Sequence, residues 1–428
     1  MRKQSQTMPA SPATQETLFK TKAESSTRSA VLSPSPKKAG RIVEIDIVRG
    51  FALFGILIVN LFYLGVPDAY YAGYFERFTD ILNRLIVYSV NFLFTGKFYP
   101  IFSFLFGLAF FIQFSSARQK GINVHSFFFR RLTALLLFGV AHIVFVWEED
   151  ILLFYALFGF ALIFLADRSP RVIIITAGMA YMLFVLVEIP DAAHLGIQKY
   201  NPFHSLEEYI FFYTHASYWE ILQVRLSLYA DKIFQPARFI HHFDRLAFFL
   251  IGLYAAKKHL VDDISARRRH WTHLWIVAFV FGILLQILWI EKLEDVVSVP
   301  LIPATRIIAN LLLFAQIFTY IVGVLLLLSV KRINSLFQIL AYPGKMALTN
   351  YLMHTTLFSF LFYSYGLGLY GSLSPVQLIV ISIGAFLFQV ILSKTWLHYF
   401  SYGPLEWIWR SFTYKKLLPI KKHHGIYS

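Results

Sequence analysis

The chain of 428 residues contains no cysteine. Disulfide bonds, metal sites with thiolate ligands and a cysteine nucleophile are therefore all excluded. Charged residues are also scarce, at 15% of the chain, whereas a soluble domain carries about a quarter. No phosphate-binding loop, dinucleotide-binding fingerprint or nucleophile elbow occurs in a matching sequence context. The sequence thus lacks the signatures of the common soluble enzymes.

Hydrophobic residues make up 57% of the chain and aromatic residues 18%. They form runs long enough to cross a bilayer, so the sequence predicts an all-α, polytopic membrane helix bundle whose main partner is the lipid bilayer. The formal net charge is +15. The basic residues lie mainly between and beside the apolar runs, which is typical of cytoplasmic loops, and we therefore expect no binding of nucleic acid.

Ten apolar runs are expected to span the membrane: residues 46–66, 98–117, 132–147, 151–166, 172–189, 239–256, 271–290, 304–330, 345–365 and 375–398. With both termini in the cytoplasm, the loops after the second, fourth, sixth and eighth spans are all cytoplasmic, and all are basic as the positive-inside rule requires. We therefore expect a multi-pass protein of the cell (plasma) membrane. An additional span at residues 74–95 would invert every later loop, so this amphipathic segment is expected at the outer surface.

Three regions are distinguished by composition. Residues 1–40 are rich in Ser, Thr, Pro, Ala and Lys and are expected to form a disordered cytoplasmic tail. Residues 41–415 form the transmembrane domain, and residues 416–428 form a basic cytoplasmic tail. The longest polar stretch inside the domain predicts two short amphipathic helices, at about residues 205–216 and 217–233.

The first span carries polar residues that crossing a bilayer does not require. Asp46 and Arg49 lie one helical turn apart and can pair, and Asn60 lies on nearly the same face as Arg49, roughly 16 Å further along the axis. Arg49 and Asp46 are candidates for binding a phosphate at the cytoplasmic entrance; the alternative is an interfacial Arg paired with its neighbour. Asn60 either orients a reacting group or forms a hydrogen bond between helices.

Two stretches near the C-terminus, GKMALTNYLMHTTLFSFLFYSYGLGLYGSLSP (Gly344–Pro375) and SKTWLHYFSYGPLEWIWRSFTY (Ser393–Tyr414), resemble the C-terminal signature of the YeiB-like family of bacterial membrane proteins, the domain of unknown function 418. The opening RIVEIDIVRGFALFGILIVN and the segment FYPIFSFLFG also match its pattern. The resemblance covers roughly residues 41–415, and the C-terminal signature lies within residues 344–414.

The family is distantly similar to transmembrane acyltransferases of the heparan-α-glucosaminide N-acetyltransferase and sugar O-acyltransferase types. This similarity implies a cytoplasmic acyl-CoA donor, an outer small-molecule or glycan acceptor, and no permanently bound cofactor. The sugar O-acyltransferases carry Arg, ten residues and then His, whereas here Arg49 is followed at that spacing by Asn60. There is also no His between Asn60 and His125, so the known histidines of both relatives are absent.

His142 is the best remaining candidate for a general base. It lies in the third span, and Asp150 begins the next helix, so a hairpin can bring the carboxylate over the imidazole. The alternative is a His that is hydrogen-bonded inside the bundle. Asn350 and His354 share one face of the ninth span and are expected to line a cavity, and Arg225 belongs to a polar region (Glu207–Arg225) expected to help bind the acceptor.

Two further clusters are expected to be structural. His241, His242 and Asp244 could resemble a metal site, but adjacent helical histidines point about 100° apart, so no metal is expected. Glu406 and Arg410 are expected to form a salt bridge on a Trp-rich interfacial helix.

The sequence thus favours an acyltransferase-like membrane enzyme, with a cavity between the first, third, fourth and ninth spans. The alternative is a transporter of a small polar or anionic solute, for which no internal repeat is visible, or a scaffold protein without chemistry.

Overall fold

The structure is a computed structural model of the chain, and it describes residues 38–66, 71–192, 201–261, 264, 266–284 and 302–422. The chain divides into two units, residues 1–43 and residues 44–428, and the second contains the features discussed below. Throughout the described ranges the secondary structure is helical, and pairing of β type is limited to one isolated bridge between Phe400 and Lys421. The expected tail up to residue 37 lies outside these ranges.

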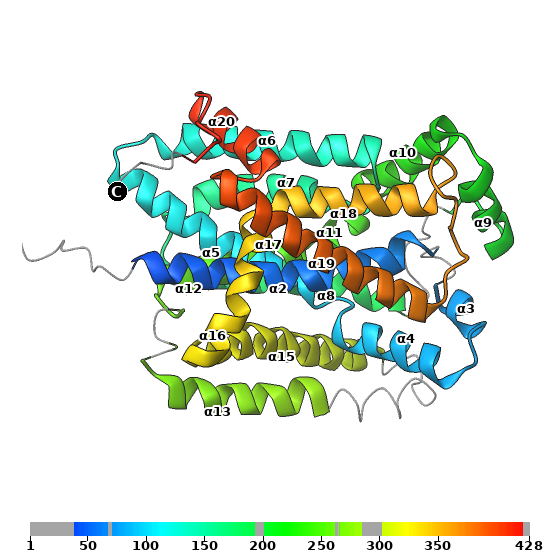
Figure 1. The fold of residues 1–428 in the computed structure, drawn as a ribbon. Coiled ribbons are helices and arrows are strands. Elements are labelled where there is room, and N and C mark those ends of the chain that lie inside the picture. Colours follow the sequence, from blue (N-terminus) through cyan, green and yellow to red (C-terminus); the bar gives the residue numbers. More distant parts are fainter. Residues whose placement is uncertain are drawn as a thin grey trace, which may run out of the picture. The chain divides into compact units, whose positions relative to one another are not determined.

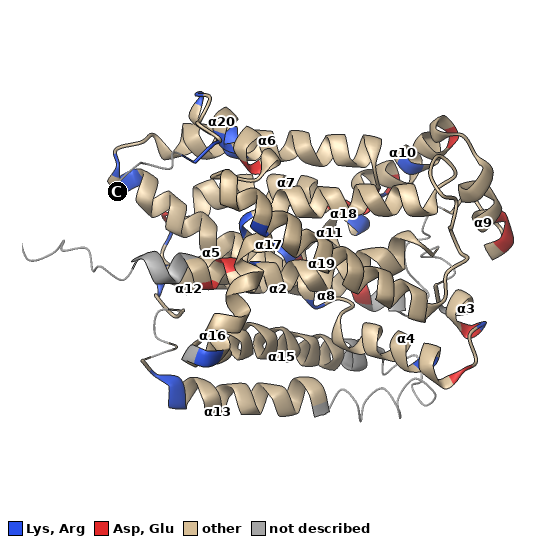
Figure 2. Cartoon of the chain, in the orientation of Figure 1, with Lys and Arg blue, Asp and Glu red and all other residues tan. Residues whose placement is uncertain are grey.

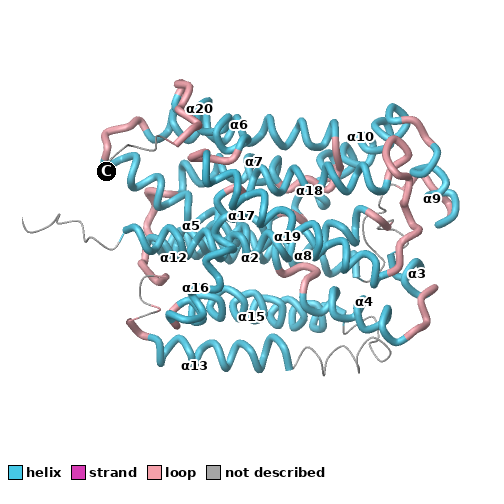
Figure 3. The backbone as a smooth tube through the Cα atoms, viewed as in Figure 1, coloured by secondary structure: helices cyan, strands magenta, loops and turns pink. Residues whose placement is uncertain are grey.

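The described part of the chain consists of a succession of helices (Figures 1 and 3). Their bounds are α2 Lys38–Leu64, α3 Tyr71–Glu76, α4 Ile81–Leu93, α5 Phe98–Gln119, α6 Val124–Phe145, α7 Leu152–Leu165, α8 Pro170–Ala192, α9 Leu206–His215, α10 Tyr218–Phe234, α11 Pro236–Ile240, α12 Phe243–Lys257, α13 Arg268–Phe279 with the π-helical η2 Val280–Leu284, α15 Ile302–Leu328, α16 Lys331–Phe337, the 3-10 turn η4 Gln338–Leu340, α17 Ala341–Lys345, α18 Ala347–Phe362, α19 Pro375–Tyr399 and α20 Pro404–Tyr414.

Most of the expected spans coincide with helices, but residues 239–256 are divided between two helices, and residues 285–290 of the expected span 271–290 lie outside the described residues. Not every helix is long enough to be called a span. Six segments in the described part are long and apolar enough to cross a membrane: Val43–Leu64, Ile81–Gln119, Val124–Phe145, Pro170–Glu188, Ile307–Leu328 and Pro375–Tyr399. The apolar α7 is shorter. The structure therefore supports a multi-pass helical membrane protein, and the number ten remains a prediction.

Local sequence signals set where several helices begin. The Asp80 side chain accepts a hydrogen bond from the Asn83 backbone at the start of α4, and Asn123 does the same for Ser126 in α6. Ser217 begins α10 and Ser374 begins α19, each in a capping box. Because such caps satisfy backbone donors that the first turn leaves free, they fix the helix starts. The two amphipathic helices expected after α8 are found as α9 and α10.

One expected span begins differently. Residues 239–256 were predicted as a single helix, whereas the short α11 ends at Ile240 and α12 starts at Phe243, after a turn at His241 and His242. The turn places Asp244 and Arg245 in the first turn of α12, where both are largely buried.

Helix α12 packs closely against α5 and α8. A side chain at Gly107 of α5 would overlap the carbonyl oxygen of Phe249, and one at Gly252 of α12 would overlap that of Phe104. The two glycines therefore allow the backbones of α5 and α12 to touch, as small residues do between membrane helices. Elsewhere α6 packs against α7 and α20, and α13 lies beside α15 (Figure 1).

The loop after α18 closes over the other end of α2. The Ser364 backbone N–H donates to the Tyr213 carbonyl of α9 at 2.9 Å, and the Gly371 N–H donates to the Gly65 carbonyl at 3.0 Å. Beneath this loop lies a buried core of mainly aromatic residues from α2, α3, α9 and α18, including Phe62, Tyr74 and Phe362.

Charge is distributed unevenly along the helices (Figure 2). Lys and Arg gather at the end of α5, at the start of α13, on α16 and on α20, on the left in this view, while α9 on the right carries acidic residues. Arg49 of α2 bonds to the carbonyl of Gly344 in α17 and lines the same cavity as Arg410 of α20.

Candidate functional site

His142 and Asp150 meet as the sequence predicts. His142 lies in the last turn of α6 and Asp150 just before α7, and the distance from Nδ1 to Oδ2 is 2.9 Å. The other oxygen of Asp150 accepts the Leu153 N–H at 2.7 Å and so caps α7. The other ring nitrogen of His142, Nε2, lies 2.8 Å from the hydroxyl of Thr355 on α18. Both ring nitrogens therefore have partners, in a site without exposed surface.

Arg49 and Asp46 form the expected pair on α2, with 2.8 Å between Nη1 and Oδ1. The same guanidinium lies 3.4 Å from the carbonyl oxygen of Gly344 in α17. A side chain at Gly344 would overlap the backbone of Asp46, so this glycine lets α17 lie directly on α2. Arg49 is thereby held between two elements that are almost 300 residues apart in sequence.

Asn60, His354 and Asn350 belong to one largely buried network of hydrogen bonds. The Asn60 amide nitrogen lies 3.2 Å from His354 Nε2, and Gln389 of α19 lies 3.4 Å from the other ring nitrogen. Gln389 also donates to the Asn350 carbonyl at 2.9 Å, and the Asn350 side chain donates to Ser393 at 2.9 Å. This network joins α2, α18 and α19, which fits the prediction of hydrogen bonds between helices as well as that of a positioned polar group.

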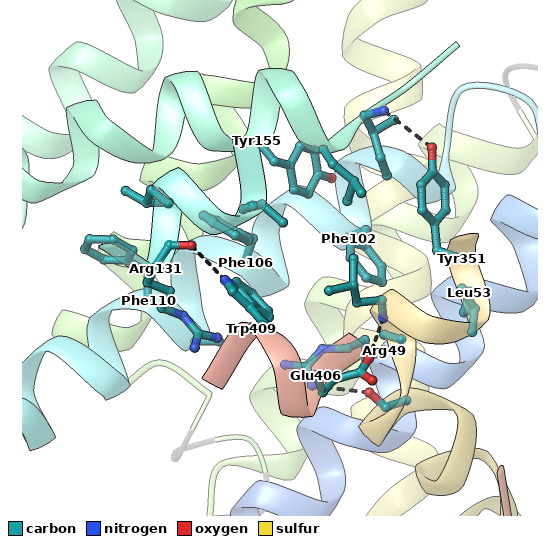
Figure 4. A pocket seen from close by; sticks show the side chains of 18 of the residues that line it. Arg49, Leu53, Phe102, Phe106, Phe110, Arg131, Tyr155, Tyr351, Glu406 and Trp409 are labelled. Atoms are coloured by element: carbon teal, nitrogen blue, oxygen red, sulfur yellow. Dashed lines mark hydrogen bonds between the residues drawn. The ribbon is translucent and has the colours of Figure 1, made fainter. Parts of the chain in front are cut away.

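A first cavity, of about 170 Å³, opens beside Arg49 (Figure 4). Its walls come from α2, α5, α6, α7, α17, α18 and α20. The charged lining residues are Arg49, Arg131, Lys345, Glu406 and Arg410. Apart from Gln113, the other side chains in its lining are mainly aromatic or aliphatic, among them Phe102, Phe106, Phe110, Phe128, Tyr155, Tyr351 and Trp409. The cavity thus combines excess positive charge with an apolar interior.

Glu406 does not play the part that the sequence predicted. Its carboxylate accepts hydrogen bonds from the backbone N–H groups of Leu348 and Thr349, at 2.7 and 3.1 Å, and from the Thr349 hydroxyl at 2.6 Å. It therefore caps the start of α18, where the free backbone donors favour a negative charge. The expected salt bridge with Arg410 is replaced by this cap, and the Arg410 guanidinium lies over the Tyr402 ring instead, at 4.6 Å.

A second cavity, of about 230 Å³, lies at the other end of α2. Asn60 lines it together with Glu148, Glu149, Arg245 and several tyrosines, which are Tyr63, Tyr99, Tyr209, Tyr213, Tyr363 and Tyr370. Two lining atoms, Glu148 Oε2 and the Tyr213 hydroxyl, are buried without a hydrogen-bond partner. Burial raises the pKa of the Glu148 carboxyl above its usual range, although Arg225 and Lys232 act in the opposite direction.

Arg225 lies behind this second cavity. Its side chain is buried, donates to the Val144 carbonyl at 3.1 Å, and has Nε 3.8 Å from Glu148 Oε2. Its guanidinium also lies 6.0 Å from the centre of the Tyr363 ring. Arg225 can therefore orient two lining residues, Glu148 and Tyr363, without lining the cavity itself.

The two cavities share only Ile56 of α2 and Ile151, the residue before α7. Of the predicted site residues, Arg49 lines the first cavity and Asn60 the second. The others line neither cavity: Asp46, His142, Asp150, Arg225, Asn350 and His354. Tyr351 connects the first cavity with the pair His142 and Asp150, because it lines this cavity and its ring lies 5.4 Å from that of His142.

Sequence reasoning missed Arg131, Lys345 and Arg410 as members of one site. Arg131 was taken as a basic residue beside a span, Lys345 only as the start of the ninth span, and Arg410 as the expected partner of Glu406. A signal was present in the sequence, because Arg49, Arg131 and Lys345 all stand near the starts of helices that would begin on the same side. No group of three or more His, Asp and Glu side chains in the described ranges could hold a metal ion.

Comparison with known proteins agrees with the resemblance seen in the C-terminal motif. The model of the DUF418 family, "Protein of unknown function (DUF418)", matches residues 255–416. The chain is 32% identical over 398 residues to "Uncharacterized protein YxaH" of Bacillus subtilis, covering 89% of this chain and 96% of the relative. It is 26% identical over 422 residues to "Uncharacterized protein YeiB" of Escherichia coli, covering 89% and 98%.

Proposed function

We propose that this chain, which belongs to the YeiB-like DUF418 family, is an acyltransferase-like membrane enzyme that passes an acyl group from acyl-CoA on one side to an acceptor on the other. The observation that carries the proposal is the pair of cavities, one basic and one lined by carboxylates and tyrosines, which share only Ile56 and Ile151. Such a pair of cavities suits a donor that stays on one side of the membrane and an acceptor that stays on the other. The distant resemblance to transmembrane acyltransferases that we expect from the sequence motifs would agree with this proposal.

The proposed orientation has the first cavity facing the cytoplasm of the cell. The basic ends of α5, α13, α16 and α20 support it, because positive residues are retained on the cytoplasmic side. In this orientation the start of α2 is cytoplasmic, and the second cavity, with Glu148 and Glu149, faces outward. Acyl-CoA, which is made inside cells, would then enter beside Arg49.

In the proposed reaction, the acceptor hydroxyl or amine attacks the thioester carbonyl carbon. A bond from that oxygen or nitrogen to the acyl group forms, the carbon–sulfur bond breaks, and the acceptor's proton ends on the CoA thiolate. We assign the proton transfer to His142, which Asp150 holds in place. The proton would pass by way of Tyr351, which reaches the first cavity.

The remaining predicted residues would position the reactants. Asn60, fixed by His354, would orient the acceptor in the second cavity, and Asn350 would hold α18 against α19. Arg225 would orient Glu148 toward the acceptor.

A second candidate function is transport of a small polar or anionic solute. It is favoured by the location of His142, which lies outside both cavities, and by the thin apolar division at Ile56 and Ile151, which could open as a gate. Transport would need no general base.

One experiment separates the two candidates. The full-length protein is reconstituted in vesicles with labelled acetyl-CoA on one side and a pool of candidate acceptors on the other, beside His142→Ala. Label that reaches an acceptor with the native chain but not with His142→Ala supports the enzyme. CoA neither bound nor consumed with any acceptor pool contradicts it, and solute flux that persists in His142→Ala favours transport.

A further inference from the structure

Three of the four cations in the first cavity form no salt bridge within the part of the chain that the structure describes. Arg49 is paired with Asp46, and the one carboxylate in the lining, Glu406, is engaged by the start of α18. Within the described ranges no ion pair involves the other three cations, Arg131, Lys345 and Arg410. Asp46 also attracts Lys345 and Arg410 from a greater distance. The four cations nevertheless outnumber Asp46 and Glu406, so the excess positive charge of the site favours an anion.

The two arginines are held by aromatic rings. The Arg131 guanidinium lies 3.8 Å over the Trp409 ring, and the Trp409 indole N–H donates to the Arg131 carbonyl at 2.7 Å. Arg410 lies over Tyr402 in the same manner. Stacking covers the face of a guanidinium and leaves its N–H edge free, and that edge matches the oxygens of a phosphate. Lys345, exposed at the end of α17, adds a third positive charge.

The interior of the same cavity is apolar. Arg49 at its charged end and Ile56 at its inner end are seven residues apart on α2, so the depth is roughly 10 Å. Between these ends the lining includes Phe102, Phe106 and Phe128. A ligand that fills the cavity must therefore carry charge at one end and an apolar chain at the other.

We propose that the first cavity binds a phosphate-bearing amphiphile, with its phosphate on Arg131, Lys345 and Arg410 and its chain along the phenylalanines. The inference rests on the proposed function in that the acyl donor would use this cavity, and it adds the three cations that recognise the donor. The phosphate and chain could belong to a soluble acyl-CoA or to a phospholipid. The shared chemistry is a phosphate joined to an apolar chain.

The test is direct binding to the purified full-length protein at low salt. Two probe pairs differ only in phosphate: S-acyl-4′-phosphopantetheine against the equally acylated pantetheine, and a short-chain phosphatidic acid against the matching diacylglycerol. We expect at least one phosphate-bearing probe to bind about tenfold or more tightly than its phosphate-free counterpart. Preference for the acylated 4′-phosphopantetheine would identify a soluble donor, and preference for phosphatidic acid a lipid donor. Equal binding within both pairs would overturn the proposal.

Charge-removing variants locate the binding. Lys345→Gln and Arg410→Gln change exposed side chains and should each weaken the phosphate-bearing probe about tenfold, and Arg131→Gln by at least as much. Lys416→Gln and Lys421→Gln remove exposed cations outside the cavity lining and serve as matched controls. Equal effects of the cavity variants and the controls would show non-specific attraction and contradict the proposal.

These outcomes are independent of acyl transfer. If phosphate-dependent binding is found but no acyl group is transferred, the cavity assignment stands and the enzyme proposal fails. If acyl transfer is found and the cavity variants leave its rate unchanged, the enzyme proposal stands and the cavity assignment fails.

Discussion

The imidazole of His142 lies between Asp150, 2.9 Å from Nδ1, and Thr355, 2.8 Å from Nε2. With the proton on Nδ1 donated to the carboxylate, the lone pair of Nε2 faces the Thr355 hydroxyl on α18. Thr355 also lies 3.0 Å from the Tyr351 carbonyl, one turn earlier. A rotation of the Thr355 side chain would therefore free the basic nitrogen Nε2 of His142.

If His142 transfers the proton, His142→Ala should lower the rate of acyl transfer about 100-fold or more, which is the usual size of a general-base contribution. Asp150→Asn should also lower the rate, because the imidazole loses its charged partner. The rate is measured in vesicles with labelled donor, together with the melting temperature.

His125→Ala is the matched control, since His125 is exposed on the same helix, α6. A His142→Ala protein that melts at a lower temperature but keeps its rate per folded molecule would show that the histidine only stabilises the bundle.

The orientation can be tested with single cysteines, because the native chain has none. Lys258→Cys and Glu207→Cys change exposed residues, at the end of α12 and on α9. We expect a membrane-impermeant thiol reagent to label Lys258→Cys only from the cytoplasmic side and Glu207→Cys only from outside. Labelling of both from one side would contradict the orientation, and the parent chain supplies the unlabelled control.

The contact between α5 and α12 predicts that the loss of stability on replacing a glycine depends strongly on where that glycine lies. Gly107→Ala should destabilise the protein by about 1–3 kcal/mol, because the new methyl group would overlap the carbonyl of Phe249 and push the helices apart. Gly178→Ala in α8 is the control, since no atom lies within 4 Å of a Cβ there, and the loss of a helical glycine should be neutral or slightly stabilising. Thermal unfolding in one detergent compares the two variants. Equal changes of the melting temperature in the two variants would show that the close packing of α5 and α12 does not cause the loss of stability.

Glu148 predicts a pH dependence of stability. Because burial raises its pKa above the ordinary value of 4.5, the folded protein binds this proton more tightly than the unfolded chain does. The stabilising contribution is thus complete below about pH 4.5 and is lost as the pH rises through the raised value. Glu148→Gln stays neutral, so its melting temperature should fall less than that of the native chain between about pH 4.5 and 7.5. Equal changes of the melting temperature with pH in the two proteins would argue against a raised pKa of Glu148.

The helices could be placed from the sequence because apolar runs and caps are local signals. Most of the expected runs coincide with helices in the described residues, and α9 and α10 were separated correctly. The break at His241 and His242 was missed, since neither residue is a strong helix breaker and the turn depends on how α11 and α12 pack. Similarly, α4 could be recognised as amphipathic, but the segment Ile81–Gln119 contains both α4 and α5 as one apolar region.

The site was harder to predict, because cavities are made by residues that are distant in sequence. The pairing of His142 with Asp150 followed from a short hairpin and was predicted. The network from Asn60 through His354 to Gln389 crosses three helices whose register the sequence does not show. The role of Glu406 was mistaken for the same reason, since its partners, Leu348 and Thr349, precede it by almost sixty residues.

The division at Ile56 and Ile151 has an electrical consequence. A cavity that admits water takes up the potential of the solution to which it opens, so in the proposed orientation most of the membrane voltage would fall across these two side chains. An ion passing this point would experience nearly the whole field, about 2.3 kcal/mol per unit charge at 100 mV, over a distance of only a few ångströms. Movement of a proton or an anion between the cavities would therefore depend on membrane potential, whereas passage of a neutral acyl group would not.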